Sequence, residues 1–148
     1  MMNSSTQGAP MKHRQRGVTL IELLIVIVVI GILAGLAVPG YRAYVIRTQR
    51  AEAKTELLRL ASGLERCFTR FNAYDNVGCA VTGGMPQPSE SGNYLLQFNA
   101  LTPGGYTLAA VPQNGQVADT DCMTLTVTSN NTRDRIGGTK TAQECWAR

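Results

Sequence analysis

An uninterrupted apolar run at residues 18–38 dominates the hydrophobic pattern of the chain. It contains one charged residue, Glu22, and otherwise only apolar residues, Thr19 and two glycines. At about 1.5 Å per residue, a helix over this run is about 32 Å long, which is enough to cross the hydrocarbon core of a bilayer. The pattern predicts a membrane-spanning helix and excludes a purely cytosolic soluble protein.

Beyond this run the pattern becomes amphipathic, with apolar residues at helical steps of four and three. One stripe consists of Leu57, Ala61, Leu64, Phe68 and Phe71. Most basic residues of the same stretch are expected off that stripe, namely Arg47, Arg50, Lys54, Arg59, Arg66 and Arg70. We predict one long helix from about residue 18 to about residue 71, with its second half docked on a globular body.

Strand-like alternation follows a loop-like stretch at residues 72–92, which is rich in Asn, Gly and Pro. Apolar and polar residues alternate at 93–99, at 106–110 and most clearly at 123–128, whereas 129–148 is expected to be irregular. Three or so short, half-polar strands predict an antiparallel sheet with one face on the helix. The expected fold class is therefore α+β, a long N-terminal helix packed on a small antiparallel sheet.

Three fixed positive charges, Lys12, Arg14 and Arg16, stand directly before the apolar run. Because Lys and Arg stay on the cytoplasmic side during insertion, the N-terminus should face the cytoplasm and the body should be exported. A cleaved secretory signal is the alternative, since Gly35-Leu36-Ala37 resembles a small-residue cleavage site. The apolar run is longer, however, than the core of about 7–15 residues that such signals have.

Glu22 is an acid within a segment that is expected to lie in lipid. A carboxylate there costs several kcal/mol at the bilayer centre and less near the interface, so the side chain should face a partner. The alternative is that Glu22 lies at headgroup level, because it is only four residues into the run.

Residues 16–26, Arg-Gly-Val-Thr-Leu-Ile-Glu-Leu-Leu-Ile-Val, resemble the prepilin motif of type IV pilins. That motif combines a basic leader ending in Gly with a hydrophobic stretch that has Glu at its fifth position. The similarity covers roughly residues 11–55 and includes Pro39-Gly40-Tyr41-Arg42-Ala43-Tyr44, which resembles the Pro-x-Tyr-x-x-Tyr continuation of these proteins. The resemblance implies the type IV pilin fold.

The resemblance also implies how the chain is processed and assembled. It implies cleavage between Gly17 and Val18 by the prepilin peptidase on the cytoplasmic face, and N-methylation of Val18. It further implies that Glu22 pairs with the N-terminal amine of a neighbouring subunit and so sets the register of assembly. Type IVa pilins usually begin the mature chain with Phe, where this chain has Val18.

Three segments are expected from this processing: a cleaved leader at 1–17, a hydrophobic transmembrane and filament-core helix at 18–40, and an exported body at 41–148. Counted from Met1 the leader has 17 residues, and counted from Met11 it has seven, which resembles a type IVa leader. Residues 1–10 contribute neither charge nor pattern, so we predict Met11 as the true start.

Gly35 and Pro39 predict a helix break near the end of the apolar run. Pro39 lacks an N–H, so the Gly35 carbonyl loses its helical partner and the helix tends to kink. Either this stretch melts locally when subunits pack, or the kink is static.

Four cysteines, at 67, 79, 122 and 145, allow three disulfide pairings. An exported body lies in a compartment that permits disulfides. Proximity along the chain favours Cys67–Cys79, which leaves Cys122–Cys145. The second pair resembles the disulfide-bounded C-terminal region of many type IV pilins. No metal or cofactor is expected, because no Cys-x-x-Cys spacing exists and the one histidine, His13, lies in the leader.

An enzyme is not expected, since the mature chain has no histidine for acid–base work and no phosphate-binding loop. The leading interpretation is a minor pilin of a type IV pilus, acting in filament assembly and in twitching motility or adhesion. A major pilin, a DNA-uptake pilin and a pseudopilin of a type II secretion system are the alternatives. Pseudopilins commonly lack the C-terminal disulfide, so Cys122 and Cys145 disfavour that last interpretation.

The expected partners are other major and minor pilins through the N-terminal helix, the prepilin peptidase, and the inner-membrane assembly platform. The expected location is the inner membrane, as a single-pass protein with a cytoplasmic N-terminus, and then the extracellular pilus.

The chain has 14 Lys and Arg against 10 Asp and Glu, a formal net charge of +4. Removal of residues 1–17 would leave 11 basic and 10 acidic residues. Of these, residues 42–70 carry seven basic and three acidic groups, whereas 71–148 carry four and six. The excess is therefore mainly a topology and processing signal, and it does not support a nucleic-acid partner.

Overall fold

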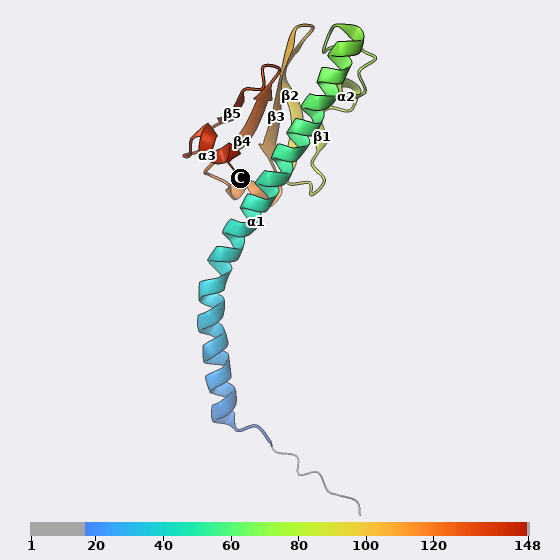
Figure 1. Cartoon of the computed structure of the whole chain (residues 1–148). Coiled ribbons are helices and arrows are strands. Elements are labelled where there is room, and N and C mark those ends of the chain that lie inside the picture. The colour runs from blue at the N-terminus through green and yellow to red at the C-terminus, as the bar shows by residue number, and fades with distance from the viewer. Residues whose placement is uncertain (1–16, 148) are drawn as a thin grey trace, which may run out of the picture. The chain divides into compact units, whose positions relative to one another are not determined.

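A computed structural model describes residues 17–147 of the chain, which falls into two compact units, Met1–Pro39 and Gly40–Arg148. The long helix α1 runs from Leu20 to Phe71 and contributes to both units (Figure 1). The helix predicted for about 18–71 is thus confirmed, and it begins two residues later than expected.

The first turn of α1 is capped by Thr19. The backbone N–H of Glu22 donates to Thr19 Oγ1 at 3.3 Å, and the N–H of Leu23 donates to the Thr19 carbonyl at 3.2 Å. A side-chain oxygen in this position satisfies a backbone donor that has no partner within the helix. The Thr19 cap therefore explains why the helix begins at Leu20.

The part of α1 that lies in the first unit is exposed on every side, from Leu20 to Pro39. Its large apolar side chains are between 47% and 82% exposed. Among the described residues, α1 is the one helix that is long and apolar enough to cross a membrane, with a mean hydropathy of 3.0 over 18 residues. By length and composition this agrees with the predicted membrane-spanning helix.

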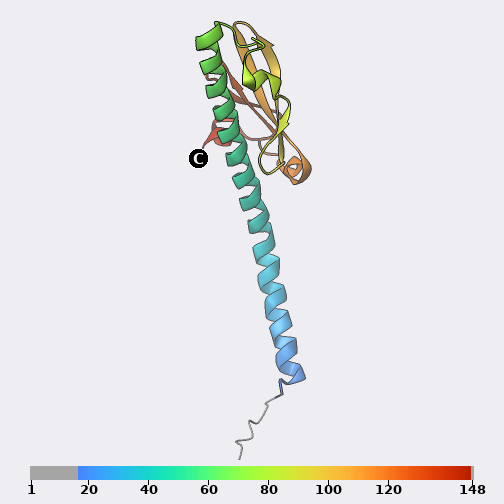
Figure 2. The ribbon, with the colours of Figure 1, turned by 90° about the vertical axis from the view of Figure 1, so that its right-hand side faces the viewer.

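Five antiparallel strands form one sheet in the order β1-β2-β3-β4-β5. They are β1 Gln87–Pro88, β2 Tyr94–Thr102, β3 Gly105–Pro112, β4 Thr124–Thr128 and β5 Arg133–Ile136. Figure 2 shows the sheet alongside the body half of α1. The antiparallel sheet of three or so strands is confirmed in β2, β3 and β4, and two short edge strands extend it.

The expectation that residues 129–148 are irregular is wrong. They contain β5 and the helix α3, Ala142–Trp146. Strand β5 could not be recognised from the sequence because Ile136 is its one apolar residue, so apolar and polar positions do not alternate along it. Two other short helical segments, α2 (Ala80–Gly83) and η1 (Asn114–Ala118), lie in the loops.

The alternation predicted for 123–128 is correct at Leu125 and Val127, which are buried in the core, but it fails at Met123 and at Thr126. Met123 is exposed, with φ at 46°, and precedes the strand, while Thr126 is buried although it points to the opposite face from its neighbours. Thr126 pairs with Ala109 of β3, which is also buried. The sheet is therefore covered on both faces at this level.

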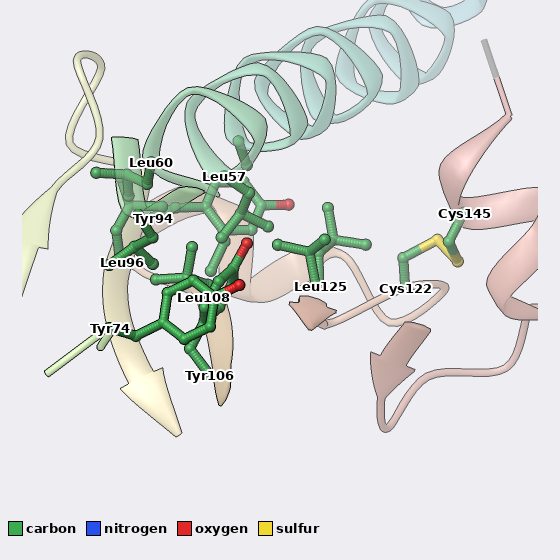
Figure 3. Packing of buried hydrophobic residues seen from close by; sticks show 14 residues of the cluster. Leu57, Leu60, Tyr74, Tyr94, Leu96, Tyr106, Leu108, Cys122, Leu125 and Cys145 are labelled. Atoms are coloured by element: carbon green, nitrogen blue, oxygen red, sulfur yellow. A yellow bond between two sulfur atoms is a disulfide. The ribbon is translucent and has the colours of Figure 1, made fainter. Parts of the chain in front are cut away.

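The hydrophobic core lies between α1 and one face of the sheet. Figure 3 shows Leu57 and Leu60 of the helix against side chains of β2, β3 and β4. The buried residues of α1 are Arg50, Ala53, Leu57, Leu60, Leu64 and Cys67. Of the predicted stripe, Leu57 and Leu64 are in this set, whereas Ala61 and Phe68 are only partly buried at its margin. The predicted stripe is therefore confirmed in part, and the buried face of α1 is centred on Leu57, Leu60 and Leu64.

Arg50 departs from the expectation for basic residues, because it is buried on the core side of α1. Its guanidinium donates from Nε at 2.9 Å and from Nη2 at 2.6 Å to the two carboxylate oxygens of Asp119. The Asp119 carboxylate also accepts from the backbone N–H of Cys122 and from Gln116 Nε2, both at 3.2 Å. This pair attaches the chain after η1 to the helix.

We predict that Asp119→Ala lowers the free energy of unfolding of the body by about 3–5 kcal/mol, because it leaves the buried Arg50 charge unpaired. The measurement is denaturant unfolding of the detergent-solubilised full chain, followed by near-ultraviolet circular dichroism. Asp121→Ala is the matched control, since Asp121 pairs with Lys140 at the surface and its loss should cost much less. Equal stabilities of the two variants would show that the buried pair contributes nothing special.

Candidate functional site

The predicted processing junction lies at the start of the described residues. Gly17, Val18 and Thr19 precede α1 in a non-helical conformation, and Val18 is 72% exposed. The Gly17–Val18 peptide bond is therefore exposed and lies outside the helix. The expected start Met11 and the basic residues Lys12, Arg14 and Arg16 lie outside the described residues.

Glu22 lies in the first turn of α1, where its N–H is held by Thr19. A carboxylate in the first turn interacts favourably with the positive end of the helix dipole. The Thr-x-x-Glu pattern at 19–22 is a helix-start signal that the sequence reasoning missed. The position of Glu22 therefore has a role within a single subunit, in addition to any role between subunits.

Gly35 and Pro39 both lie within α1, which the structure shows as one helix from Leu20 to Phe71. No break occurs at either residue in the isolated chain, although Pro39 removes one backbone donor. Local melting on packing of subunits stays a prediction about the filament.

Two disulfides close neighbouring segments of the body. Cys67 in the last turns of α1 is joined to Cys79 with Cα atoms 5.7 Å apart, and Cys122 before β4 is joined to Cys145 in α3 at 5.6 Å. Figure 3 shows the second bond beside the core. These are the pairs that proximity along the chain favours.

Basic side chains gather around α3. We define the α3 surface as Arg47, Lys54, Arg133, Lys140 and Trp146. The Arg133 guanidinium lies over the Trp146 ring at 5.7 Å from its centroid, and Lys54 Nζ donates to the Ala147 carbonyl at 2.7 Å. Arg47 and Lys140, together with Lys54, line a hollow of about 530 Å³ between α1 and α3. The surface thus combines residues from α1, from β5 and from the disulfide-bounded segment.

The acidic residues of this region are already engaged. Asp121 accepts from Lys140 at 2.9 Å, and Glu144 accepts from the N–H of Thr141 at 2.9 Å in the capping box that starts α3. Within residues 17–147, ion pairs are formed only by Arg50 with Asp119 and by Lys140 with Asp121. Burial, with Arg50 nearby as the second cause, lowers the pKa of Lys54.

The three glutamates of the body half of α1 are used inside the body. Glu52 and Glu56 accept the backbone N–H groups of Ser91 and Glu90, each at 2.8 Å. Glu65 accepts hydroxyl hydrogen bonds at 3.0 Å from Tyr74 and Tyr106. Among the described residues, none of these three glutamates forms an ion pair with an arginine of α1.

Within residues 17–147, no group of three or more His, Cys, Asp or Glu side chains is placed to hold a metal ion.

Comparisons with known proteins agree with the fold and the motif. A crystal structure of the non-core minor pilin PilV of Neisseria meningitidis matches 67% of this chain and 94% of its own, with a TM-score of 0.51 and 18% identity, which shows the same fold. The type IV major fimbrial protein FimA of Dichelobacter nodosus (strain VCS1703A) is 42% identical over 103 residues, 68% of this chain and 54% of that protein. The fimbrial protein of Neisseria meningitidis serogroup A is 33% identical over 138 residues, 93% of this chain and 69% of that protein.

Two protein families match successive parts of the chain. The prokaryotic N-terminal methylation motif matches residues 12–38, and the family described as "Type IV minor pilin ComP, DNA uptake sequence receptor" matches residues 39–126, more than half of the chain. The chain therefore belongs to the type IV pilins, within the family of the minor pilin ComP. The expected pilin fold is confirmed. The chain spans about half the length of the FimA relative that it matches.

We predict that acid loosens α3. The hydrogen bond from Lys140 lowers the pKa of Asp121, and the backbone hydrogen bond from Thr141 lowers the pKa of Glu144. A lowered pKa in the folded state contributes stability that is present above the ordinary carboxyl pKa and is lost as the pH falls through the lowered one. The fluorescence of Trp146, the one tryptophan, should therefore change as the pH falls from the ordinary carboxyl pKa through the lowered values. In Glu144→Gln the fluorescence step should shrink, and a step of unchanged size in that variant would contradict the prediction.

Proposed function

We propose that the protein is a minor structural subunit of a type IV pilus that acts in filament assembly and in twitching motility or adhesion. One combination of observations supports this most: a methylation motif followed by a fully exposed apolar helix, joined to a body of the ComP minor pilin family. This role requires no catalytic chemistry of the chain. A pseudopilin of a type II secretion system shares the N-terminal motif, but the relatives named above are pilins.

Processing of this subunit would divide the chain at Gly17–Val18. A prepilin peptidase would remove residues 1–17, and the new amine of Val18 would be methylated. The exposed, non-helical conformation of residues 17–19 supports this assignment. Residues 18–40 would then anchor the subunit in the inner membrane, with the N-terminus cytoplasmic and the body 41–148 exported.

Assembly would move the apolar half of α1 from the lipid bilayer into contact with other subunits. Its side chains are exposed all around the helix, so they need lipid before assembly and other major and minor pilins afterwards. In that environment the Val18 amine and the Glu22 carboxylate are costly to bury alone and attract each other strongly. We propose that Glu22 binds the amine of a neighbouring subunit at the assembly platform, and that the helix around Gly35 and Pro39 melts locally as subunits pack.

For Glu22→Ala we predict normal membrane insertion but roughly a tenfold loss of incorporation into pili, which corresponds to about 1.4 kcal/mol. The measurement is the ratio of this subunit in sheared pili to that in membranes. Thr19→Ala is the matched control, because it removes the helix cap but keeps the carboxylate. Wild-type incorporation of Glu22→Ala would refute the role, and an equal loss in Thr19→Ala would assign the effect to the helix end.

A second candidate role is that of a DNA-uptake pilin. The matching family is described as a DNA uptake sequence receptor, which supports the same role for this chain. The α3 surface presents Arg47, Lys54 and Arg133 outside any ion pair of the described residues. Such groups bind phosphates by displacing counterions. The net charge of the chain does not indicate this surface, because its cations come from separate segments of the sequence.

We predict that the detergent-solubilised full chain retards duplex DNA in a gel shift, and that the double variant Lys54→Gln, Arg133→Gln binds more weakly. Loss of two phosphate contacts should reduce the slope of log K against log salt by about 2. The matched control is Arg59→Gln, Arg66→Gln, which removes two exposed arginines from another part of α1. A greater loss in the control would move the DNA contact away from the α3 surface, and no shift with unaltered protein would reject the DNA role.

A further inference from the structure

An apolar groove at the end of the body where the chain enters it is not explained by either role. It has a volume of about 350 Å³ and is lined by Tyr41, Val45 and Ile46 of α1 and by Gly115 and Ala118 of η1. Its lining is predominantly apolar, and the adjacent Val117 is 63% exposed. Tyr41 is 70% exposed and Tyr44 is 66% exposed. We call this groove, without Val117 and Tyr44, the basal groove.

Hydrogen bonds within the body hold η1 in place against α1. The side chain of Gln116 is fully buried and donates from Nε2 to the Ile46 carbonyl at 3.3 Å and to the Tyr94 hydroxyl at 2.8 Å. Because Gln116 turns inward, its neighbour Val117 projects outward. The buried pair of Arg50 and Asp119 fixes the end of the same segment. The exposure of Val117 is thus built into the packing of the body.

The position of the groove along the chain indicates what it meets. Tyr41 is three residues beyond Val38, the last residue of the apolar run. Three residues of helix advance about 4.5 Å, and the headgroup layer on each side of a bilayer is about 5–8 Å thick. Tyr41 therefore falls where tyrosines collect at membrane interfaces. Arg42, which also lines the groove, supplies positive charge for lipid phosphates.

We propose that the basal groove and Val117 rest in the phospholipid headgroup layer before the subunit is assembled. The lipid surface is thus a second, peripheral contact of the body, made by η1 in addition to the helix that spans the membrane. This inference rests on the membrane anchoring proposed above. Lipid is favoured over a neighbouring subunit because Tyr41, which lines the groove, follows the apolar run by three residues along the chain and is next to Arg42.

The test places an environment-sensitive fluorophore at position 117 of the full chain. Val117→Cys, labelled with a nitrobenzoxadiazole dye, is reconstituted into vesicles of phosphatidylethanolamine and phosphatidylglycerol. Val77→Cys is the matched control, since Val77 is fully exposed and follows the far end of α1. We expect blue-shifted emission at 117 and quenching by lipids brominated near the headgroup, with neither effect at 77. Non-reducing peptide mapping checks that both native disulfides remain.

Each outcome bears on one of the two proposals. If the protein floats with the vesicles but positions 117 and 77 behave alike, the lipid contact is rejected while the membrane anchor stands. If the protein does not float with vesicles, the anchoring proposal itself fails, and the inference falls with it. If position 117 is shielded in sheared pili but not in vesicles, a neighbouring subunit covers the groove and the lipid contact is rejected.

Discussion

The body of this pilin depends on one buried ion pair. Arg50 and Asp119 join α1 to the segment that follows η1, and the same carboxylate holds the N–H of Cys122. Cys122 in turn is bonded to Cys145, so the pair positions α3 through a short series of contacts. Removing two charges from water is costly, and that cost is offset only when the geometry is well satisfied, as it is here by two direct hydrogen bonds. Arg50 also lines the hollow beside α3, and Ala118, which lines the basal groove, directly precedes Asp119.

The parts of the fold that follow from regular periodicity were predictable. The apolar run and the stripe through Leu57 and Leu64 predict α1, because a helix repeats its faces every three to four residues. Strand β5 and helix α3 were not predictable from hydrophobicity, since β5 buries no apolar side chain and α3 has only five residues. Arg50 could not be placed because its burial depends on a partner 69 residues away. The Thr-x-x-Glu signals at 19–22 and 141–144, by contrast, were readable and mark both helix starts.

The candidate sites divide in the same way. Gly17, Val18 and Glu22 were found from the sequence because the motif that carries them is contiguous. The α3 surface was not found from the sequence, because it combines residues from α1, from β5 and from the last disulfide loop. A count of formal charges along the chain also does not show which charged groups are paired. Residues 71–148 hold an acidic excess, yet Asp119, Asp121 and Glu144 are each bound to a neighbour. Electrostatic character here is a property of the surface rather than of the segment.

The arrangement of the disulfides has a consequence for export. Each cysteine is bonded to the next one along the chain, so the two loops neither overlap nor enclose one another. If the body is exported as proposed above, starting from the end of the membrane-spanning helix, Cys67 and then Cys79 emerge before Cys122 appears. An oxidant that joins thiols in their order of appearance therefore produces the native bonds directly. On this route no isomerase is needed to correct the pairing. The Cys67–Cys79 loop can close before β4 and β5 have crossed the membrane, whereas the second loop closes only after both strands and Cys145 have emerged.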